Sequence, residues 1–335
     1  MGQNLKNRFV GTVAMASLGI SLMACQPSQT QISKGDLAAG IVNGKTAQQN
    51  DISSGGLAES VVFIQTKLSA TEGAACTGTL IANNIVLTAA HCLSDDHDPK
   101  KMAVALHALD LTTGTRPVGM VVFHVKALTA NPGYAPKDPN GHQQNDLAVL
   151  LLDASVPAGT RVAQLPSPSF DVGTLASVLT IGYGQSDDRH STPNEQSGAG
   201  ILRYTTFGSD ASGQKEFEVA PTTSDVPAFI QGMILASAQD TSVCHGDSGG
   251  PLMAVSGSNS QNIIVGVNDM VLPQVGYQGQ MGQDYQDAAK TGSLDGFYQK
   301  YPDARICMGG YNVFVNLAPQ VGWITTTMKA LQAQP

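Results

Sequence analysis

Three polar side chains, far apart in the chain, have the types that nucleophilic catalysis requires. They occur in three segments: His91 in TAAHC (residues 88–92), Asp146 in NDLAVLLL (145–152) and Ser248 in CHGDSGGP (244–251). A serine hydroxyl is a weak nucleophile at neutral pH and needs a general base, and imidazole titrates near that pH. The base needs an acceptor that fixes its tautomer, which a carboxylate provides. We therefore predict an acyl-transfer site made of His91, Asp146 and Ser248.

The segment around Ser248 also offers backbone donors. The N–H groups of Gly246 and Ser248 are candidates for an oxyanion hole, in which one donor contributes about 2.7–4 kcal/mol to transition-state stabilisation. Glycine at 246 permits a backbone conformation that a side chain would resist. The context is Gly-Asp-Ser-Gly-Gly, not the Gly-X-Ser-X-Gly turn of α/β-hydrolases, which excludes an esterase of that fold.

The order His, Asp, Ser with these flanking residues resembles the chymotrypsin/trypsin family of serine endopeptidases. The segment IVNG at 41–44 is similar to the mature start of that family, and IGYG at 181–184 to one of its strand ends. The resemblance covers nearly all of 41–328. It implies an all-β, trypsin-like peptidase domain over 41–335. Two antiparallel β-barrels, about 41–160 and about 170–320, would hold the active site between them, and a C-terminal helix would follow at about 321–333.

The residue patterns agree with such a fold. Short β-rich runs, separated by Gly, Pro, Asn and Asp, predict many short strands, among them 61–64, 85–88, 147–152, 178–181 and 263–267. In the last segment, Ile324, Met328 and Leu331 fall at i, i+4 and i+7 and share one apolar face, which predicts a helix.

The resemblance implies a zymogen switch. In the family, the carboxylate beside the nucleophile pairs with a newly freed N-terminal ammonium, which here would join Asp247 to Ile41 after cleavage behind Gly40. Leaving one partner of a buried ion pair unpaired costs about 3–5 kcal/mol, enough to hold the oxyanion loop inactive. The alternative is that Asp247 only binds nearby amides.

The N-terminus has the features of a targeting segment. Residues 1–24 carry Lys6 and Arg8 before a short apolar run, which predicts a signal peptide, and the run ends in LMAC at 22–25, which resembles a bacterial lipobox. We expect a lipid on Cys25, a pro-segment over 25–40, and an outer-membrane or periplasmic location with release after activation. The alternative is an ordinary secretory signal with a chance cysteine.

Cysteine usage is consistent with export. If Cys25 carries lipid, four cysteines remain, and they allow three pairings. The family resemblance implies the bridges Cys76–Cys92 and Cys244–Cys307, which need an oxidising compartment. A metal site is the other use of clustered cysteines, but no C-x-x-C spacing occurs.

The expected specificity pocket departs from that of tryptic enzymes. By resemblance, Ser242 lies at the pocket floor where trypsin-like enzymes carry Asp, so a preference for basic side chains is not expected. Val243 is bulkier than the usual residue, and Asn312 stands where a glycine opens the pocket wall. These residues predict a shallow pocket for small or modest apolar side chains.

Two insertions and one altered segment also depart from the family. The insertions are 187–197, which is polar, and 269–306, which is either a lid at the pocket mouth or surface decoration. Where the family often reads Val-Ser-Trp-Gly, this chain has Val267-Asn268-Asp269-Met270, which puts substrate binding in question. The acidic run 95–98 is either a metal site or, as we expect, a solvated turn.

These observations lead to one functional hypothesis and one alternative. We expect an exported monomeric serine endopeptidase, made as a zymogen, that cleaves protein or peptide substrates through an acyl-enzyme without metal or cofactor. Its partner would be the bacterial membrane, through the lipid on Cys25. A net charge of −8 without a basic patch predicts no nucleic-acid binding. The alternative is a catalytically weak homologue that acts as a surface protein-binding module.

Overall fold

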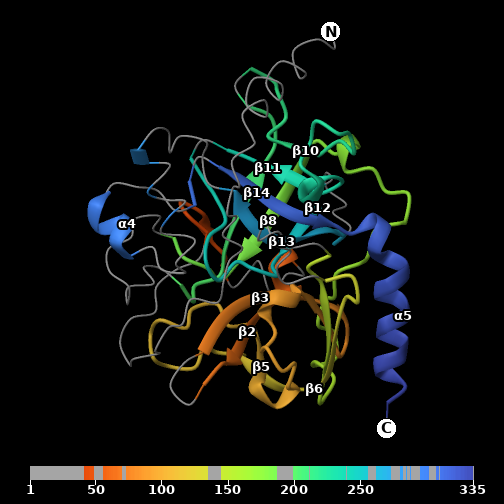
Figure 1. Cartoon of the computed structure of the whole chain (residues 1–335). Helices are drawn as coiled ribbons and strands as arrows, with labels where there is room; N and C mark the ends of the chain where they lie inside the picture. Colours follow the sequence, from red (N-terminus) through yellow and green to blue (C-terminus); the bar gives the residue numbers. More distant parts are fainter. Residues whose placement is uncertain are drawn as a thin grey trace.

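The computed structural model describes residues 41–48, 56–69, 73–134, 145–186, 199–210, 212–238, 240–255, 262–272, 280–281, 284, 287, 295–301, 307–308 and 310–334. The predicted signal peptide, Cys25, the predicted pro-segment 25–40 and the insertion 187–197 lie outside these residues. The described part forms a β-barrel and a second β-sheet, with one longer helix at the C-terminus, as Figure 1 shows.

The first half of the chain closes into a six-stranded antiparallel barrel in the order β2-β3-β4-β7-β6-β5. Its strands are β2 (Val61–Lys67), β3 (Gly73–Ala82), β4 (Ile85–Thr88), β5 (Met102–Leu106), β6 (Val121–Ala130) and β7 (Ala148–Leu152). Strand β7 reads AVLLL and is buried at every position, because it lies between β4 and β6 and faces the core. The β-rich runs of the sequence therefore become strands as predicted.

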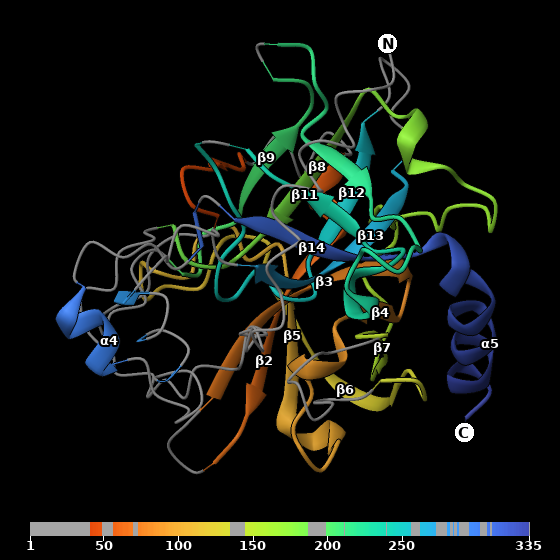
Figure 2. The same cartoon turned by 45° about the horizontal axis from the view of Figure 1, so that its top comes forward.

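The second half forms an eight-stranded antiparallel sheet in the order β1-β9-β8-β12-β13-β14-β11-β10. Its strands are β1 (Lys45–Thr46), β8 (Ser177–Gly182), β9 (Arg203–Phe207), β10 (Phe217–Val219), β11 (Ile234–Ala236), β12 (Pro251–Val255), β13 (Ile264–Leu272) and β14 (Tyr311–Asn316). Figure 2 shows β8, β12, β13 and β14 together in this sheet. Barrel, sheet and terminal helix agree with the trypsin-like fold predicted from the sequence.

One strand is placed differently from the expectation. The sequence predicts that residues from 41 to about 160 form the first barrel. In the structure, β1 instead pairs with β9 of the second sheet, with Lys45 opposite Tyr204 and Thr46 opposite Arg203. The closed barrel begins only at Val61. The physical reason is that β9 is otherwise an edge strand, and β1 satisfies its free backbone groups.

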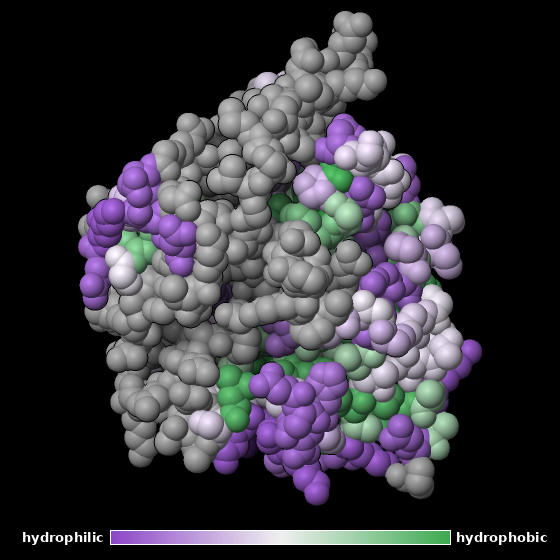
Figure 3. Space-filling view, in the orientation of Figure 1, coloured by the Kyte–Doolittle hydropathy of each residue, from purple (hydrophilic) through white to green (hydrophobic). Residues whose placement is uncertain are grey.

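The helices are few among the described residues. Five 3-10 turns lie between strands, and a sixth, η6 (Ala318–Gln320), leads into the C-terminal helix. The five are η1 (Leu57–Ser60), η2 (Ala90–Cys92), η3 (Pro99–Lys101), η4 (Val172–Thr174) and η5 (Ala228–Ile230). Helix α4 (Asp295–Lys300) lies apart from the sheets in Figure 1, and the residues coloured at its place in Figure 3 are mostly hydrophilic. No described helix is both long and apolar enough to cross a membrane.

The C-terminal helix α5 (Val321–Gln332) follows the second sheet but packs on the first barrel, beside β6 and β7 (Figures 1 and 2). Ile324 and Leu331 are buried and Met328 is partly buried, so the predicted apolar face is the packed one. At its two ends the helix reaches barrel loops, since Gln320 donates to Asn145 at 3.1 Å and Gln332 to Asn84 at 2.9 Å. Helix α5 therefore fastens the two halves together.

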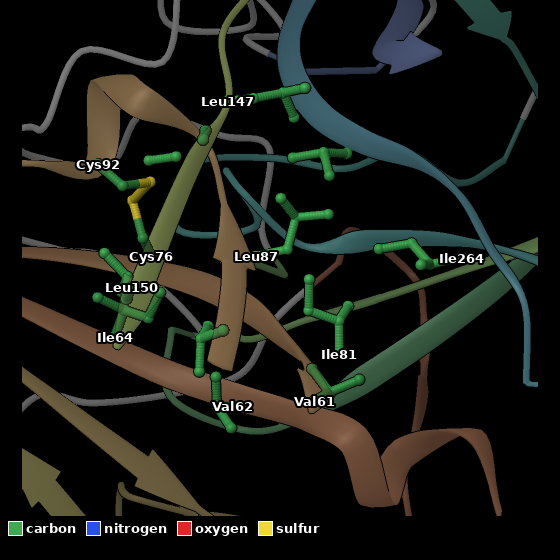
Figure 4. Packing of buried hydrophobic residues seen from close by; sticks show 14 of the residues in the cluster. Val61, Val62, Ile64, Cys76, Ile81, Leu87, Cys92, Leu147, Leu150 and Ile264 are labelled. Carbon is green, nitrogen blue, oxygen red and sulfur yellow. A yellow bond between two sulfur atoms is a disulfide. The ribbon is translucent and has the colours of Figure 1, made fainter. Parts of the chain in front are cut away.

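The core of the first barrel extends to the turn that carries His91. Figure 4 shows the disulfide between Cys76 and Cys92 beside the buried side chains of Ile64 and Leu150. This bridge joins β3 to η2, and a cross-link across a short loop stabilises mainly by restricting the unfolded chain. The turn with His91 is thereby fixed to the barrel wall.

Candidate active site

His91 and Asp146 are brought together by neighbouring strands. His91 lies on η2, directly after β4, and Asp146 lies two residues before β7, which pairs with β4. The Nδ1 atom of His91 is 2.5 Å from Oδ2 of Asp146, and the backbone N–H of His91 donates to Oδ1 at 2.9 Å. Both oxygens of one carboxylate are thus engaged by one residue, which fixes the imidazole plane.

The environment of Asp146 keeps it ionised. Asp146 is fully buried, and burial acts to raise its pKa, but the charge attraction of His91 and the hydrogen bonds from His91 hold that pKa below its ordinary value. A carboxylate at this place fixes the proton of the imidazole on Nδ1. The Nε2 atom of His91 is then free to accept a proton.

Ser248 comes from the second half of the chain, in the loop that leads into β12. Gly246 in this loop has a φ of 95°, and a Cβ added there would lie 2.8 Å from the Cα of Gly184, so glycine is required for both conformation and space. Within the described residues, the N–H groups of Gly246 and Ser248 donate to no other group. Both amides therefore remain candidate donors to an oxyanion.

The loop of Ser248 is tied to the first barrel by Thr77, a residue of β3. The N–H of Thr77 donates to the carbonyl of Ser248 at 2.8 Å, and its hydroxyl donates to the carbonyl of Gly246 at 2.9 Å. The same hydroxyl accepts the N–H of Tyr183 at 3.1 Å. The adjacent Cys76 is bridged to Cys92, next to His91. One short stretch of β3 thus positions both the base and the nucleophile loop.

His91 and Ser248 are not hydrogen-bonded to each other in this structure. Neither Nε2 of His91 nor Oγ of Ser248 has a partner among the described residues, although both residues are buried. Such bonds are often long in proteins without substrate and tighten when substrate binds. The two residues are 9% and 2% exposed, so little of either is accessible to solvent.

Asp247, beside Ser248, is buried against the start of the described chain. It accepts the N–H of Gly184 and of Cys244, both at 2.8 Å, and the N–H of Ile41. Burial raises the pKa of Asp247 to about 7, although these hydrogen bonds act to lower it. A Cβ at Gly184 would meet this carboxyl group at 2.6 Å, so glycine there permits the close approach.

Ile41 is seated in the protein interior. It is fully buried, and Val42 next to it exchanges backbone hydrogen bonds with Ser242, at 2.9 and 3.4 Å. Its φ is 51°, in the left-handed region that a β-branched residue rarely adopts and that costs about 1–3 kcal/mol. The structure therefore brings Ile41 to Asp247, the two residues of the predicted switch.

The three residues predicted to line the specificity pocket, Ser242, Val243 and Asn312, form one buried cluster. The hydroxyl of Ser242 lies 2.7 Å from Oδ1 of Asn312 and 2.8 Å from the carbonyl oxygen of Cys307, and Oδ1 of Asn312 also accepts the N–H of Val243 at 2.9 Å. The amide nitrogen of Asn312 donates to Ala236 at 3.0 Å. The side-chain amide of Asn312 thus binds three polar groups: the hydroxyl of Ser242, the N–H of Val243 and the carbonyl of Ala236. The disulfide Cys244–Cys307, implied by the family resemblance, is present beside the cluster, as is Cys76–Cys92.

The segment after Val267 contains a β-bulge. Asn268 pairs with Phe314 and Met270 with Val313, so Asp269 is an extra residue in β13. Because of this residue, Val271 lies opposite Asn312 in the ladder. A letter-by-letter alignment of Val267-Asn268-Asp269-Met270 with the family segment Val-Ser-Trp-Gly places Met270 at the glycine. Such an alignment does not include the bulge.

Sequence reasoning did not single out Thr77 or Asp269. Thr77 carries no motif, and its role comes from the pairing of β3 with distant loops. Asp269 did give a signal, since a carboxylate replaces an aromatic residue in an otherwise apolar strand. Asp269 is fully buried, and one side-chain atom each of Asp269, Asp146 and His91 lie within 4.8 Å of one another.

Two features at the surface have local explanations. In the acidic turn, Asp96 pairs with Lys101 at 2.6 Å, and Asp98 caps η3 by accepting the N–H of Lys100 at 3.0 Å. In the insertion 269–306, the described part includes α4, where Lys300 and Tyr301 both bond Asp284. The rest of this insertion lies mostly outside the described residues.

Comparison with known proteins agrees with this geometry. Residues 41–281 match the family described as Trypsin. This is more than half of the chain, and it includes His91, Asp146 and Ser248. The chain therefore belongs to the trypsin family of serine proteases.

Individual relatives are distant. The chain is 27% identical to neutrophil elastase of Mus musculus over 198 residues, 58% of this chain and 63% of that protein. It is 28% identical to granzyme M of Homo sapiens over 54% of this chain and 65% of that protein. Trypsin alpha of Drosophila melanogaster is 28% identical over 57% of this chain and 66% of its own length. The matches thus span just under two thirds of these relatives.

Proposed function

We propose that this protein is a serine endopeptidase whose catalytic residues are His91, Asp146 and Ser248. The observation that carries the proposal is the double contact of Asp146 with His91, through Nδ1 at 2.5 Å and the backbone N–H at 2.9 Å. Of the two ring nitrogens of His91, Nε2 is the one that has no partner among the described residues. Family membership supports protein or peptide substrates.

The chemistry follows from these groups. Oγ of Ser248 attacks the scissile carbonyl carbon while Nε2 of His91 takes the hydroxyl proton. The N–H groups of Gly246 and Ser248 bind the oxyanion, and Asp146 stabilises the imidazolium. His91 then gives its proton to the leaving amine, and water releases the acyl group from Ser248 by the same steps in reverse order.

Replacement of the nucleophile tests the assignment. Ser248→Ala removes only one buried oxygen atom, so the protein should fold as before while peptide hydrolysis falls by about a million-fold. Hydrolysis of a fluorogenic peptide library by both purified proteins, with equal thermal unfolding as the control for folding, gives the answer. An Ala variant with the turnover of the original protein would refute the proposal.

For specificity, we propose a preference for small or modest apolar side chains before the scissile bond. The support is the buried cluster of Ser242, Val243 and Asn312, which holds no acidic group to bind a basic side chain. Val271, opposite Asn312, adds a branched side chain at the same end of the two strands. Efficient cleavage after Lys or Arg would contradict this assignment.

For activation, we propose cleavage between Gly40 and Ile41. In the uncut chain, Asp247 is buried and accepts backbone N–H groups, the charge of Arg203 is the smallest of the influences on its pKa, and Ile41 is held at a φ of 51°. Cleavage would turn the N–H of Ile41 into an ammonium group, which offers a full counter-charge to Asp247. Cleavage would also release Ile41 from this backbone conformation, because φ of Ile41 is defined by the peptide bond to Gly40 that the cut removes.

We further propose that the chain is exported and that cleavage releases it from a membrane. If Cys25 is acylated, the anchor lies on residues 25–40, and the four other cysteines pair within the catalytic part. A cut behind Gly40 would therefore leave no covalent link to the lipid. N-terminal sequencing of the soluble and membrane fractions tests this; a fully active soluble enzyme that still carries residues 25–40 would contradict it.

A further inference from the structure

A second carboxyl group lies beside the catalytic one. Asp269 is the extra residue of the bulge in β13, and β-bulges near active sites commonly redirect a side chain. Its exposed fraction is zero, and one of its carboxyl oxygens lies within 4.8 Å of side-chain atoms of both Asp146 and His91. The bulge thus adds an acidic side chain to the pair that orients the base.

The two carboxyl groups have unequal surroundings. Asp146 receives two hydrogen bonds from His91, whereas neither oxygen of Asp269 has a donor among the described residues. An isolated ionised carboxylate in the protein interior is very costly, and such a group takes up a proton instead. Two carboxylates at this separation also repel each other, so the pair retains one proton.

The proton belongs on Asp269. Ionised Asp146 is stabilised by His91, while burial and then the charge of Asp146 raise the pKa of Asp269 well above its ordinary value. Tyr134, another described titratable group near the pair, offers Asp269 no positive charge: it is mostly buried, and its pKa is raised by burial and then by the charges of Asp146, Asp269 and Asp95. A protonated Asp269 becomes a hydrogen-bond donor, and the carboxylate of Asp146 is its acceptor.

We propose that Asp269 is a positioning residue that remains a neutral carboxylic acid and donates a hydrogen bond to Asp146. Asp146 then holds three donors: the backbone N–H of His91, Nδ1–H of His91 and the hydroxyl of Asp269. The third bond fixes the side-chain rotamer of Asp146 and thereby the direction of the His91 ring. This role rests on the proposed peptidase function, since it concerns the same site.

The charge state of Asp269 can be read without turnover. In the Ser248→Ala background at pH 7, the infrared spectrum of the parent minus that of Asp269→Asn should contain the carbonyl band of a protonated carboxylic acid. Asp284→Asn is the matched control, because burial is low there and Lys300 holds the pKa of Asp284 at about 2, so only carboxylate bands should disappear. Loss of carboxylate bands alone in Asp269→Asn would overturn the proposal. A stoichiometric metal ion that binds Asp269 would overturn it too.

The positioning role has its own readouts. Asp269→Asn keeps a hydrogen-bond donor, so three readouts should stay near those of the original protein. They are the Nδ1 proton resonance of His91, the kcat, and the acid midpoint of the kcat/KM profile. Asp269→Ala removes the donor, and kcat should fall about 10-fold to 100-fold with little change in KM, the range of lost outer hydrogen bonds at functional sites. If Asp269 were ionised, Asp269→Asn would lower the acid midpoint by about 1 unit or more.

Two further outcomes are distinguishable. If Asp269→Asn does not fold, Asp269→Ser serves as the neutral donor. If the original protein has no peptidase activity, the proposed function fails, but the infrared and proton measurements still report on Asp269. An Asp269→Ala protein with unchanged kcat and an unchanged Nδ1 proton resonance would show that Asp269 does not position Asp146.

Discussion

The hydroxyl of Thr77 in the first barrel donates to the carbonyl of Gly246 in the second half of the chain, at 2.9 Å. The same hydroxyl accepts the N–H of Tyr183, and the backbone N–H of Thr77 binds the carbonyl of Ser248. Because the carbonyls of Gly246 and Ser248 are held from the barrel, their loop presents its N–H groups in a fixed direction. A residue without catalytic chemistry thus connects the two halves at the point where the reaction is proposed to occur.

We expect Thr77→Val to weaken both folding and activity. The change keeps the shape but leaves a buried carbonyl and a buried N–H without their partner, at a cost of about 1–3 kcal/mol for each group. The free energy of unfolding should fall by that order, and kcat should fall more than KM changes. Urea unfolding and peptide kinetics measure both effects.

Thr79→Val is the matched control for this change. Thr79 lies on the same strand and is equally buried, but its hydroxyl has no partner among the described residues. Its replacement should leave stability unchanged or improve it. Equal losses in Thr77→Val and Thr79→Val would show that the contact with Gly246 has no special importance.

The stability of the uncut protein should decrease as the pH rises. The pKa of Asp247 is about 7 in the folded chain against an ordinary value of 3.8. Between these values the folded state binds the proton and the unfolded state does not, so the stability contributed by Asp247 is full below about pH 4 and is lost as the pH rises to about 7. Unfolding of uncut Ser248→Ala protein between pH 4 and 8 measures this slope.

Two forms serve as comparisons for the pH experiment. In Asp247→Asn, residue 247 carries no titratable group. The free energy of unfolding of the uncut variant should therefore lack the part of the pH dependence that Asp247 contributes. The form cut behind Gly40 should also have a shallower slope, since the ammonium of Ile41 would stabilise the ionised carboxylate. Identical slopes in all three proteins would argue against Asp247 as the switch.

Asn312→Gly should open the pocket at the expense of stability. Without the amide, the N–H of Val243 and the carbonyl of Ala236 lose their side-chain partner, while the hydroxyl of Ser242 still has the carbonyl of Cys307. Unfolding should therefore become easier by about 1–3 kcal/mol for each group that water does not reach. Larger side chains should then be accepted before the scissile bond. Profiling of cleaved peptides reports the change, with Asn316→Gly on the same strand as control. If Asn312→Gly prefers the same side chains before the scissile bond as the original protein, Asn312 does not line the pocket.

Removal of the Cys76–Cys92 disulfide should destabilise the turn that carries His91. The bridge spans 16 residues, and a loop of this size corresponds to about 3 kcal/mol of stabilisation. The double replacement by Ala should lower the melting temperature and reduce kcat, because η2 then loses its covalent link to β3 and is held by packing and hydrogen bonds. Full activity at low temperature, with a lower melting temperature, would mean that the bridge contributes stability but does not position His91.

The fold could be predicted from the sequence because its signals are local or belong to motifs. The alternating and apolar runs of β2 and β7 and the apolar face of α5 are set by side-chain periodicity, which needs no tertiary information. The relation of His91 to Asp146 could be predicted from the chemistry of the two residue types and from the family resemblance of their segments, and the structure shows that it arises from the pairing of β4 with β7.

What the sequence does not predict depends on register and on long-range contacts. The place of β1 in the second sheet follows from a free edge at β9, which no local pattern reveals. The bulge at Asp269 shifts the ladder by one residue and sets Val271 opposite Asn312, a register that no pattern of residue letters reveals. The contacts of Thr77 join residues 106 and 169 positions apart in the chain.

The most direct test of the account is covalent labelling of the nucleophile. The activated protein, treated with a serine-directed phosphonate, should gain one adduct per chain, and peptide mapping by mass spectrometry should place it on Ser248. The adduct should be absent in Ser248→Ala and formed far more slowly in His91→Ala, since the base is needed to activate the hydroxyl. A protein that hydrolyses peptides but is labelled elsewhere, or that is never labelled and never hydrolyses a peptide after cleavage behind Gly40, would contradict the assignment.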